Sequence, residues 1–305
     1  MRIIFMGTPD FAVASLEALI RAGEQVVAVV TAPDKPAGRG QKIHESAVKI
    51  FATQQHIPVL QPVKLRDKTF LDQLSSYQAD LQVVVAFRML PEVVWNMPKH
   101  GTINVHASLL PQYRGAAPIN HAIINGETES GVTTFLLQHE IDTGNILLSA
   151  KVAIKETDTA GDLHDNLMQL GALTLLETIR QLKEGTLQPK NQDDIVPVMH
   201  LKHAPKIFKE DCKINWDQPV DAVYNFIRGL SPFPTAYTLL DGKVLKIYST
   251  AREYTPTPAA PGTIATDKKS YLKFAAQDGY ITVNELQLEG KKKMNVVDFL
   301  KGYRF

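Results

Sequence analysis

The sequence predicts an α/β protein in two parts, a parallel-sheet domain followed by a smaller domain built of β-strands. Three observations support this prediction. Short apolar strands alternate with helical stretches over the first two-thirds of the chain, a polar stretch broken by prolines follows, and the last hundred residues carry a run of short strands. Strands that are apolar on both faces and alternate with helices are typical of a parallel sheet covered on both sides. A chain of 305 residues is long enough for two domains.

The first part begins with the strand 2–7, which ends at Gly7, and the amphipathic helix 10–23, which ends at Gly23. The same alternation continues along the chain. We expect further strands at 25–31, 57–62, 80–87, 101–108, 131–138 and 144–154. We expect further helices near 46–55, 67–77, 116–126 and 159–184, with a short helical turn within 90–98. Residues 32–43, rich in Pro, Gly and basic residues, are expected to form a loop.

The second part contains one short helix at 222–230 and then only strands. Residues 236–250 form an expected hairpin with Asp241-Gly242 at its turn, and 261–290 add several short strands. This pattern is typical of a small β-barrel or sandwich, and we expect an OB-like barrel. We therefore divide the chain into a catalytic domain (1–188), a linker (189–205) and a C-terminal β-barrel domain (206–305).

Composition limits the class of protein. The net charge is +1, but residues 206–305 hold 15 Lys and Arg against 11 Asp and Glu, so the last third is mildly basic and suits a phosphate-rich partner. One cysteine, Cys212, cannot form an internal disulfide and fits a reducing compartment. No apolar run reaches the roughly 18 residues of a membrane span. We expect a cytoplasmic protein with no membrane association.

The turn after the first strand argues against a dinucleotide cofactor. The order Gly7-Thr8-Pro9-Asp10-Phe11 lacks the second and third glycines that allow a backbone to approach a pyrophosphate. The predicted fold is therefore Rossmann-like without the usual ligand, and the function must be inferred from another site.

That site is predicted at the carboxyl end of the strand 101–108. Side chains alternate along a strand, so Asn104 and His106 share one face, at the edge where open α/β sheets bind ligands. An Asn amide donates to a carbonyl oxygen that gains charge, and a His accepts a proton or supports the oxyanion while charged. With no Ser or Cys nucleophile evident, this pair suits acyl-type transfer to a substrate amine. The alternative is a structural His that caps the sheet edge.

A catalytic His needs a carboxylate to orient it. The best candidate is Asp142, which follows a strand and precedes Thr143-Gly144 at a sharp turn. Glu140 and His139 compete for this role, and simple turn chemistry also explains an Asp at this position.

These motifs together resemble the formyltransferase family that uses 10-formyltetrahydrofolate. The resemblance rests on Asn104-x-His106-x-Ser108-Leu109-Leu110-Pro111, on "QYRGAAP" after it, and on Asp142-Thr143-Gly144. It implies that Asn104, His106 and Asp142 form the catalytic group and that no metal takes part. It also implies that 10-formyltetrahydrofolate is the formyl donor, that the folate-binding loop is Ser108, Leu109, Leu110 and Pro111, and that the pterin contacts Phe87, Arg88, Met89 and Leu90.

The resemblance extends over essentially the whole chain to members that formylate the methionine of initiator methionyl-tRNA, through "APDKPAGRGQK" and the C-terminal third. It implies that this loop and the C-terminal domain bind the tRNA. Basic residues on a glycine-rich loop follow a phosphate backbone well. The expected tRNA-binding residues are Lys35, Arg39, Lys42, Lys268, Lys269, Lys291, Lys292 and Lys293. For each lysine alone, a solvated surface charge is the plain alternative.

The residues leave other activities open. Formyl transfer to an amino sugar nucleotide and hydrolysis to formate would use the same three catalytic residues, whereas a folate- or tRNA-binding protein without turnover would not need them. A carboxylate neighbour favours a charged His, which favours oxyanion support over a simple base, but both roles remain open. We expect the chain to act as a monomer.

Overall fold

The computed structural model describes residues 1–37, 42–195, 200–255 and 259–304. They form two compact units whose segments interleave along the chain. Unit 1 comprises Met1–Gly115, Gly131–Val152 and His164–Lys202. Unit 2 comprises Ala116–Ser130, Ala153–Leu163 and His203–Phe305. The chain thus passes between the units more than once, whereas the sequence patterns suggest one crossing; the boundaries at 188 and 206 stay a prediction.

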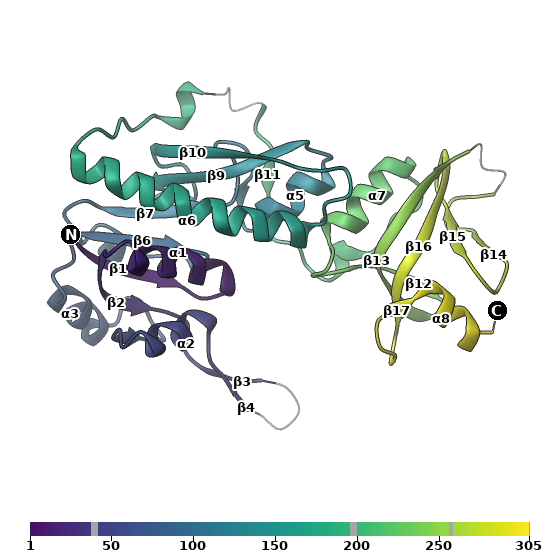
Figure 1. Cartoon of the computed structure of the whole chain (residues 1–305), viewed down its shortest axis with the longest axis horizontal. Coiled ribbons are helices and arrows are strands. Elements are labelled where there is room, and N and C mark those ends of the chain that lie inside the picture. The colour runs from purple at the N-terminus through teal and green to yellow at the C-terminus, as the bar shows by residue number, and fades with distance from the viewer. Residues whose placement is uncertain (38–41, 196–199, 256–258, 305) are drawn as a thin grey trace. The chain divides into compact units, whose positions relative to one another are not determined.

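Unit 1 is built on a seven-stranded sheet with the order β10-β9-β7-β6-β1-β2-β5 (Figure 1). The strands are β1 (Arg2–Gly7), β2 (Gln25–Val30), β5 (Val59–Leu60), β6 (Leu81–Val85), β7 (Thr102–His106), β9 (Glu129–Leu136) and β10 (Ile146–Ala153). Helices follow them: α1 (Asp10–Arg21), α2 (Ala47–Gln54), α3 (Lys68–Ser76), α4 (Glu92–Trp95) and α6 (Ala160–Glu184). The predicted α/β fold class with a smaller β-rich part is confirmed.

The local sequence explains where these helices begin and end. The Ser46 hydroxyl accepts a hydrogen bond from the backbone N–H of Lys49, and the Asp67 carboxylate accepts one from Phe70, so both side chains cap helix N-termini. Gly23 follows α1 with a φ of 77°, a conformation that glycine adopts without a steric penalty.

The sheet is mixed, which differs from the wholly parallel sheet that the alternation suggests. The pairs β2–β5, β1–β2, β1–β6 and β6–β7 are parallel, but β9 runs antiparallel to β7. Because β9 is antiparallel, its last residue, Leu136, pairs with Ile103 near the start of β7, and Thr133 pairs with His106 at the end of β7.

The segment expected as a loop near residues 32–43 is partly a β-ribbon. Strand β3 (Lys35–Ala37) pairs antiparallel with β4 (Lys42–His44). In this ribbon Pro36 pairs with Ile43, and proline is tolerated in edge strands because only one side of such a strand is hydrogen-bonded. The composition does not indicate the pairing of β3 with β4, and residues 38–41 of the expected loop lie outside the described residues.

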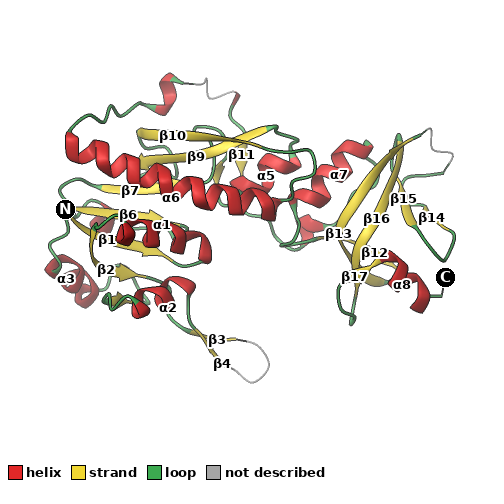
Figure 2. Cartoon of the chain, viewed as in Figure 1, coloured by secondary structure: helices red, strands yellow, loops and turns green. Residues whose placement is uncertain are grey.

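Unit 2 consists mainly of an antiparallel sheet with the order β12-β13-β16-β15-β14, with β17 paired to β16 (Figure 2). The strands are β12 (Ala236–Leu240), β13 (Lys243–Tyr254), β14 (Ile264–Thr266), β15 (Leu272–Ala275), β16 (Gly279–Leu288) and β17 (Met294–Asn295). Its helices are α5 (Pro118–Ile124), α7 (Val220–Gly229) and α8 (Val296–Gly302). The predicted Asp241-Gly242 hairpin turn is present, and both residues have positive φ.

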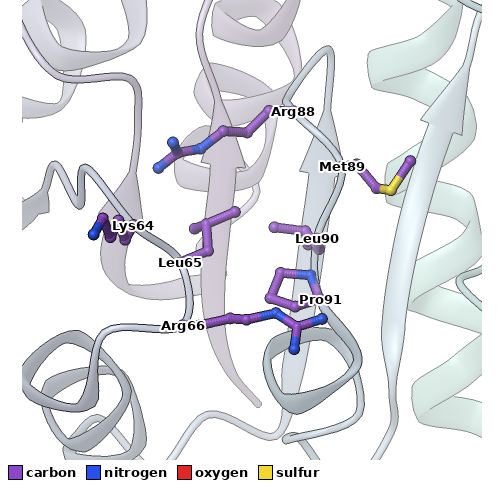
Figure 3. A pocket seen from close by; sticks show the side chains of 7 residues that line it. All are labelled: Lys64, Leu65, Arg66, Arg88, Met89, Leu90 and Pro91. Atoms are coloured by element: carbon purple, nitrogen blue, oxygen red, sulfur yellow. The ribbon is translucent and has the colours of Figure 1, made fainter.

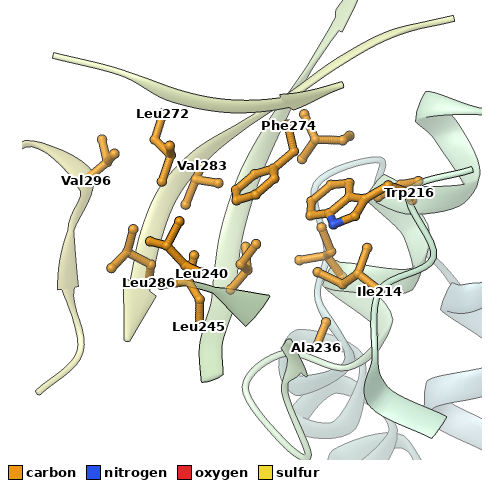
Figure 4. Packing of buried hydrophobic residues seen from close by; sticks show 14 of the residues in the cluster. Ile214, Trp216, Ala236, Leu240, Leu245, Leu272, Phe274, Val283, Leu286 and Val296 are labelled. Carbon is orange, nitrogen blue, oxygen red and sulfur yellow. The ribbon is translucent and has the colours of Figure 1, made fainter. Parts of the chain in front are cut away.

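The core of unit 2 gathers apolar side chains from the sheet and from α7 and α8 (Figure 4). The indole ring of Trp216 stacks on Phe274, with ring centroids 4.5 Å apart. The indole N–H donates to the Thr238 hydroxyl, so its one polar group is satisfied inside the core.

Part of the predicted linker packs against unit 1. Lys190 bridges to Ile146 through backbone hydrogen bonds, and a short 3-10 helix, η1 (Gln192–Asp194), follows with Gln192 1% exposed. The remaining short elements are β8 (Arg114–Gly115), β11 (His203–Ala204) and the 3-10 helix η3 (Glu210–Cys212). In the described ranges, no helix is both long enough and apolar enough to cross a membrane.

Candidate active site

The structure places Asn104 and His106 on one face of β7, as strand alternation predicts. Asn104 pairs with Phe135 of β9, and the rings of His106 and Phe135 meet edge to face at 6.4 Å. His106 is 7% exposed, and Asn104 is half-buried. Within the described ranges the Asn104 amide has no side-chain hydrogen bond, so its donors are available to a ligand.

Both nitrogens of the His106 ring face oxygen atoms. The Nε2 atom lies 3.0 Å from the backbone oxygen of Tyr113, which can only accept, so Nε2 carries the proton of this hydrogen bond. The Nδ1 atom lies 3.8 Å from the Oδ2 atom of Asp142. That separation is too long for a hydrogen bond but close for an interaction between charges. The Nδ1 atom is therefore the ring nitrogen that faces the Asp142 carboxylate.

Asp142 is held in place by the backbone around it. Its Oδ2 atom accepts a hydrogen bond of 2.9 Å from the N–H of Gly115, and its φ of 56° lies in the left-handed region that Asp tolerates. Because β9 ends beside the start of β7, the loop after Leu136 must return along the sheet for Asp142 to reach His106. Gly144 allows this return, because a Cβ atom there would lie 1.6 Å from the Leu136 oxygen.

The two competing candidates lie elsewhere. The imidazole of His139 is exposed, meets Trp95 edge to face and lies 3.5 Å from Glu92. Glu140 is exposed, and its backbone oxygen accepts a hydrogen bond from the Thr143 hydroxyl. Of the acidic residues near this turn, Asp142 is the one that the structure brings to His106.

The segment Ser108–Pro111 forms a hydrogen-bonded turn directly after His106. The Leu110–Pro111 peptide bond is cis, and the Ser108 hydroxyl donates to the Gln112 oxygen. Leu109 packs so closely on Gly131 that a Cβ there would lie 2.5 Å from the leucine. The Thr133 hydroxyl donates to the Ser108 oxygen at 2.7 Å and accepts from the Leu110 N–H at 3.1 Å. Thr133 was not predicted from the sequence. Its position opposite His106 follows from the pairing of β9 with β7, which has no local signal.

The segment Phe87–Leu90 follows β6, the strand next to β7. Arg88, Met89 and Leu90 of this segment line a pocket of about 490 Å³, and Phe87 does not (Figure 3). The Arg88 guanidinium lies 5.7 Å from the centroid of the Phe87 ring. It donates hydrogen bonds to the backbone oxygens of Pro62 and Val63. The pocket wall combines basic and apolar side chains, namely Lys64, Leu65, Arg66, Arg88, Met89, Leu90 and Pro91. Met89 is 72% exposed, so this wall presents free apolar surface.

The basic residues predicted for tRNA binding fall in both units. Lys35 is exposed on β3; Lys42 lies on β4, where its backbone alone is described, and Arg39 lies outside the described residues. In unit 2, Lys268 and Lys269 are exposed on the β14–β15 turn. Lys291, Lys292 and Lys293 are exposed between β16 and β17; Lys293 pairs with Glu285 at 2.8 Å and lies over the Tyr248 ring.

Comparison of the sequence with known protein families identifies the family. The family model described as "Formyl transferase" matches residues 1–179, and the model "Formyl transferase, C-terminal domain" matches residues 206–304. The chain belongs to the formyltransferase family.

Among relatives in this family, the methionyl-tRNA formyltransferase of Bacteroides thetaiotaomicron is 53% identical over 309 residues, covering 100% of this chain and 96% of the relative. The methionyl-tRNA formyltransferase of Porphyromonas gingivalis W83 is 50% identical over 310 residues, covering 99% of this chain and 96% of the relative.

Solved structures share the fold of the family at lower identity. WlaRD, a sugar 3N-formyl transferase solved in the presence of dTDP and 5-N-formyl-THF, superposes with a TM-score of 0.68 at 22% identity, covering 96% of this chain and 99% of its own. HypX from Aquifex aeolicus in complex with tetrahydrofolic acid has a TM-score of 0.67 at 18% identity, covering 99% of this chain and 48% of HypX. Glycinamide ribonucleotide transformylase 1 from Symbiobacterium toebii has a TM-score of 0.52 at 20% identity and covers 63% of this chain and 94% of its own.

Proposed function

We propose that this chain transfers the formyl group of 10-formyltetrahydrofolate to the α-amino group of methionyl-tRNA, giving formylmethionyl-tRNA for the initiation of translation. The observation that carries the proposal is the grouping of Asn104, His106 and Asp142 at one end of β7 in a chain whose full-length relatives at about half identity are named for this reaction. A protein that only binds folate or tRNA has no use for a free amide beside a His–Asp pair.

The pocket formed by residues 64–66 and 88–91, after the end of β6, suits the formyl donor in its chemistry. A folate consists of a flat aromatic ring system and a tail with carboxylates, and it needs an apolar wall and cations. Leu65, Leu90 and Met89 supply apolar surface, and Lys64, Arg66 and Arg88 supply positive charge. When bound, the donor supplies the formyl carbon. The methionine amine forms a bond to that carbon and loses a proton, the bond from the carbon to the folate nitrogen breaks, and tetrahydrofolate leaves with a proton on that nitrogen.

The residues of the chain have separate tasks in the transfer. Asn104 donates a hydrogen bond to the formyl oxygen as that oxygen gains negative charge. His106 takes up or holds the proton on Nδ1, because its Nε2 hydrogen bond to Tyr113 is already made. Asp142 stabilises the ring when both nitrogens carry protons, since its carboxylate faces Nδ1.

A single assay tests the reaction. Mixing the chain with 10-formyltetrahydrofolate and methionyl-tRNA should yield formylmethionine after alkaline release. His106→Ala should lower turnover by about 100-fold or more, the usual scale for loss of a proton-transfer group. The matched control is His164→Ala, which removes a surface His that also contacts an Asp. Release of formate without formylmethionine, or formylation of an amino sugar nucleotide in its place, would overturn the proposal.

We further propose that the basic residues of both units bind the tRNA phosphates and that initiator tRNA is preferred. Phosphate contacts make affinity fall with salt, so Arg39→Ala or Lys268→Ala should flatten the plot of log affinity against log salt by about one unit each. Lys301→Ala is the control, because Lys301 pairs with Asp298 on α8. An unchanged slope in both variants contradicts their assignment. Equal rates with initiator and elongator methionyl-tRNA contradict the preference.

We propose that the chain acts in the cytoplasm, because methionyl-tRNA is used there. We propose that it acts as a monomer, since every residue of the proposed catalytic group comes from one chain. Light scattering across a range of concentrations should give the mass of one chain, 33.8 kDa. A stable mass of twice that value would contradict the monomer.

A further inference from the structure

A buried glutamine outside the proposed catalytic group joins the segments that carry it. The side chain of Gln192 is 1% exposed and lies on η1, within the polar stretch that the sequence suggests is a linker. A polar side chain as fully buried as this one is costly unless all of its donors and acceptors are used.

The Gln192 amide uses all of its donors and acceptors on the two segments that carry Asp142 and Arg114. Its Nε2 atom donates to the backbone oxygen of Asp142 at 2.9 Å and to that of Gly144 at 2.7 Å. Its Oε1 atom accepts from the Nε and Nη2 atoms of Arg114 at 3.0 and 2.7 Å. The orientation of the amide follows from these partners, since backbone oxygens only accept and a guanidinium only donates.

The two segments that the amide joins meet again at the carboxylate. Gly115, the neighbour of Arg114, donates its N–H to the Oδ2 atom of Asp142, and Tyr113 accepts from His106. Gln192 therefore fixes the Asp142 backbone on one side and the 113–115 segment on the other. Both contacts therefore fix the position of the Asp142 carboxylate, which faces His106.

We propose that Gln192 is a positioning residue for the reaction, which holds the left-handed turn at Asp142 so that the carboxylate faces the Nδ1 atom of His106. This inference rests on the proposed function only for its kinetic readout. An error of about 1 Å in the placement of a catalytic group can lower a rate by about 100-fold. The 3.8 Å separation of Nδ1 and Oδ2 leaves the pair sensitive to such a shift.

The test replaces the amide with groups of similar size that cannot donate. Gln192→Glu keeps an acceptor for Arg114 but cannot donate to the two backbone oxygens, and Gln192→Met removes both functions while filling the space. Both variants should lower kcat by about 10- to 100-fold and leave the KM for methionyl-tRNA within about twofold of the parent. The matched control is Gln138→Glu, which alters an exposed glutamine that donates to the Thr143 hydroxyl in the same loop.

A second readout needs no substrate. The ¹⁵N resonances of the His106 ring, assigned by their loss in His106→Ala, should shift in both Gln192 variants and stay in place in Gln138→Glu. Folded Gln192 variants with unchanged His106 resonances and parental kcat overturn the proposal, as does an equal loss of kcat in Gln138→Glu. If the parent transfers no formyl group, the proposed function fails, and the ring resonances still decide whether Gln192 positions this pair.

Discussion

The Nδ1 atom of His106 lies 3.8 Å from the Oδ2 atom of Asp142, although 35 residues separate them in the sequence and β9 leads the chain away from His106. The same Oδ2 atom accepts the N–H of Gly115. One carboxylate oxygen thus faces the imidazole and is held by the backbone of the segment that follows the Ser108–Pro111 turn.

Removing the charge of Asp142 tests this relationship. Asp142→Asn keeps the size of the side chain and an acceptor for Gly115 but removes the negative charge that stabilises a protonated His106. We expect kcat to fall by about 100- to 10,000-fold in the formyl-transfer assay, the range found when a proton-transfer group is disabled. Asp165→Asn is the control, since Asp165 contacts His164 at 2.9 Å on the surface, and it should keep the parental rate. Parental turnover in Asp142→Asn would show that the carboxylate serves only the turn.

The turn after His106 depends on the hydroxyl of Thr133. Thr133→Val keeps the shape but leaves the Ser108 oxygen and the Leu110 N–H without this partner, which costs about 1–3 kcal/mol for each buried group left unsatisfied. We expect a lower midpoint in urea denaturation and a higher KM for the formyl donor.

The control for that change is Thr174→Val, because the Thr174 hydroxyl donates to the backbone oxygen of Leu170 within its own helix. It should leave the KM for the formyl donor unchanged. An unaltered KM in Thr133→Val as well would separate Thr133 from the donor site.

Gly144 is required by close packing. A Cβ atom at this position would lie 1.6 Å from the Leu136 oxygen, so Gly144→Ala must displace the loop that carries Asp142. We expect loss of most turnover and a lower melting temperature by calorimetry. Gly302→Ala is the control, because no atom of the described residues lies within 4 Å of a Cβ there, and it should melt like the parent. A fully active Gly144→Ala variant would mean that the loop does not depend on the close contact between Gly144 and the Leu136 oxygen.

The base of the β3–β4 ribbon should show a pH-dependent stability. Hydrogen bonds from Lys49 and Gln61 hold the pKa of the Asp34 carboxyl below its usual range. A carboxyl whose pKa is lowered on folding stabilises the protein above its unfolded pKa, and that stability is lost as the pH falls through the folded value.

Asp34→Asn should therefore be less stable than the parent in urea at pH 7, and the difference should shrink below about pH 4, where the unfolded carboxyl begins to take up its proton. Asp72→Asn, which breaks an exposed pair with Lys68 one helical turn away, should change little at either pH. A difference that does not depend on pH would assign the effect of Asp34 to packing.

The sequence by itself determined the order of the elements and the face on which Asn104 and His106 lie. Both follow from local rules, since apolar periodicity separates strands from helices and alternation along a strand needs only the strand itself. The hairpin at Asp241-Gly242 is equally local. The ribbon at 35–44 and the helix α8 were not predicted, because loop composition and short apolar runs do not show how a segment pairs or packs.

The tertiary structure alone decided the rest of the site. Whether Asp142, Glu140 or His139 meets His106 depends on the antiparallel direction of β9 and on the return of the loop after it, and neither has a local signal. Thr133 and Gln192 act through hydrogen bonds to segments 23 to 78 residues away along the chain. The sequence predicts a polar linker near residue 192, but in the structure this stretch holds the buried amide of Gln192. The burial of a polar side chain depends on hydrogen-bond partners far away in the chain and not on its sequence neighbours.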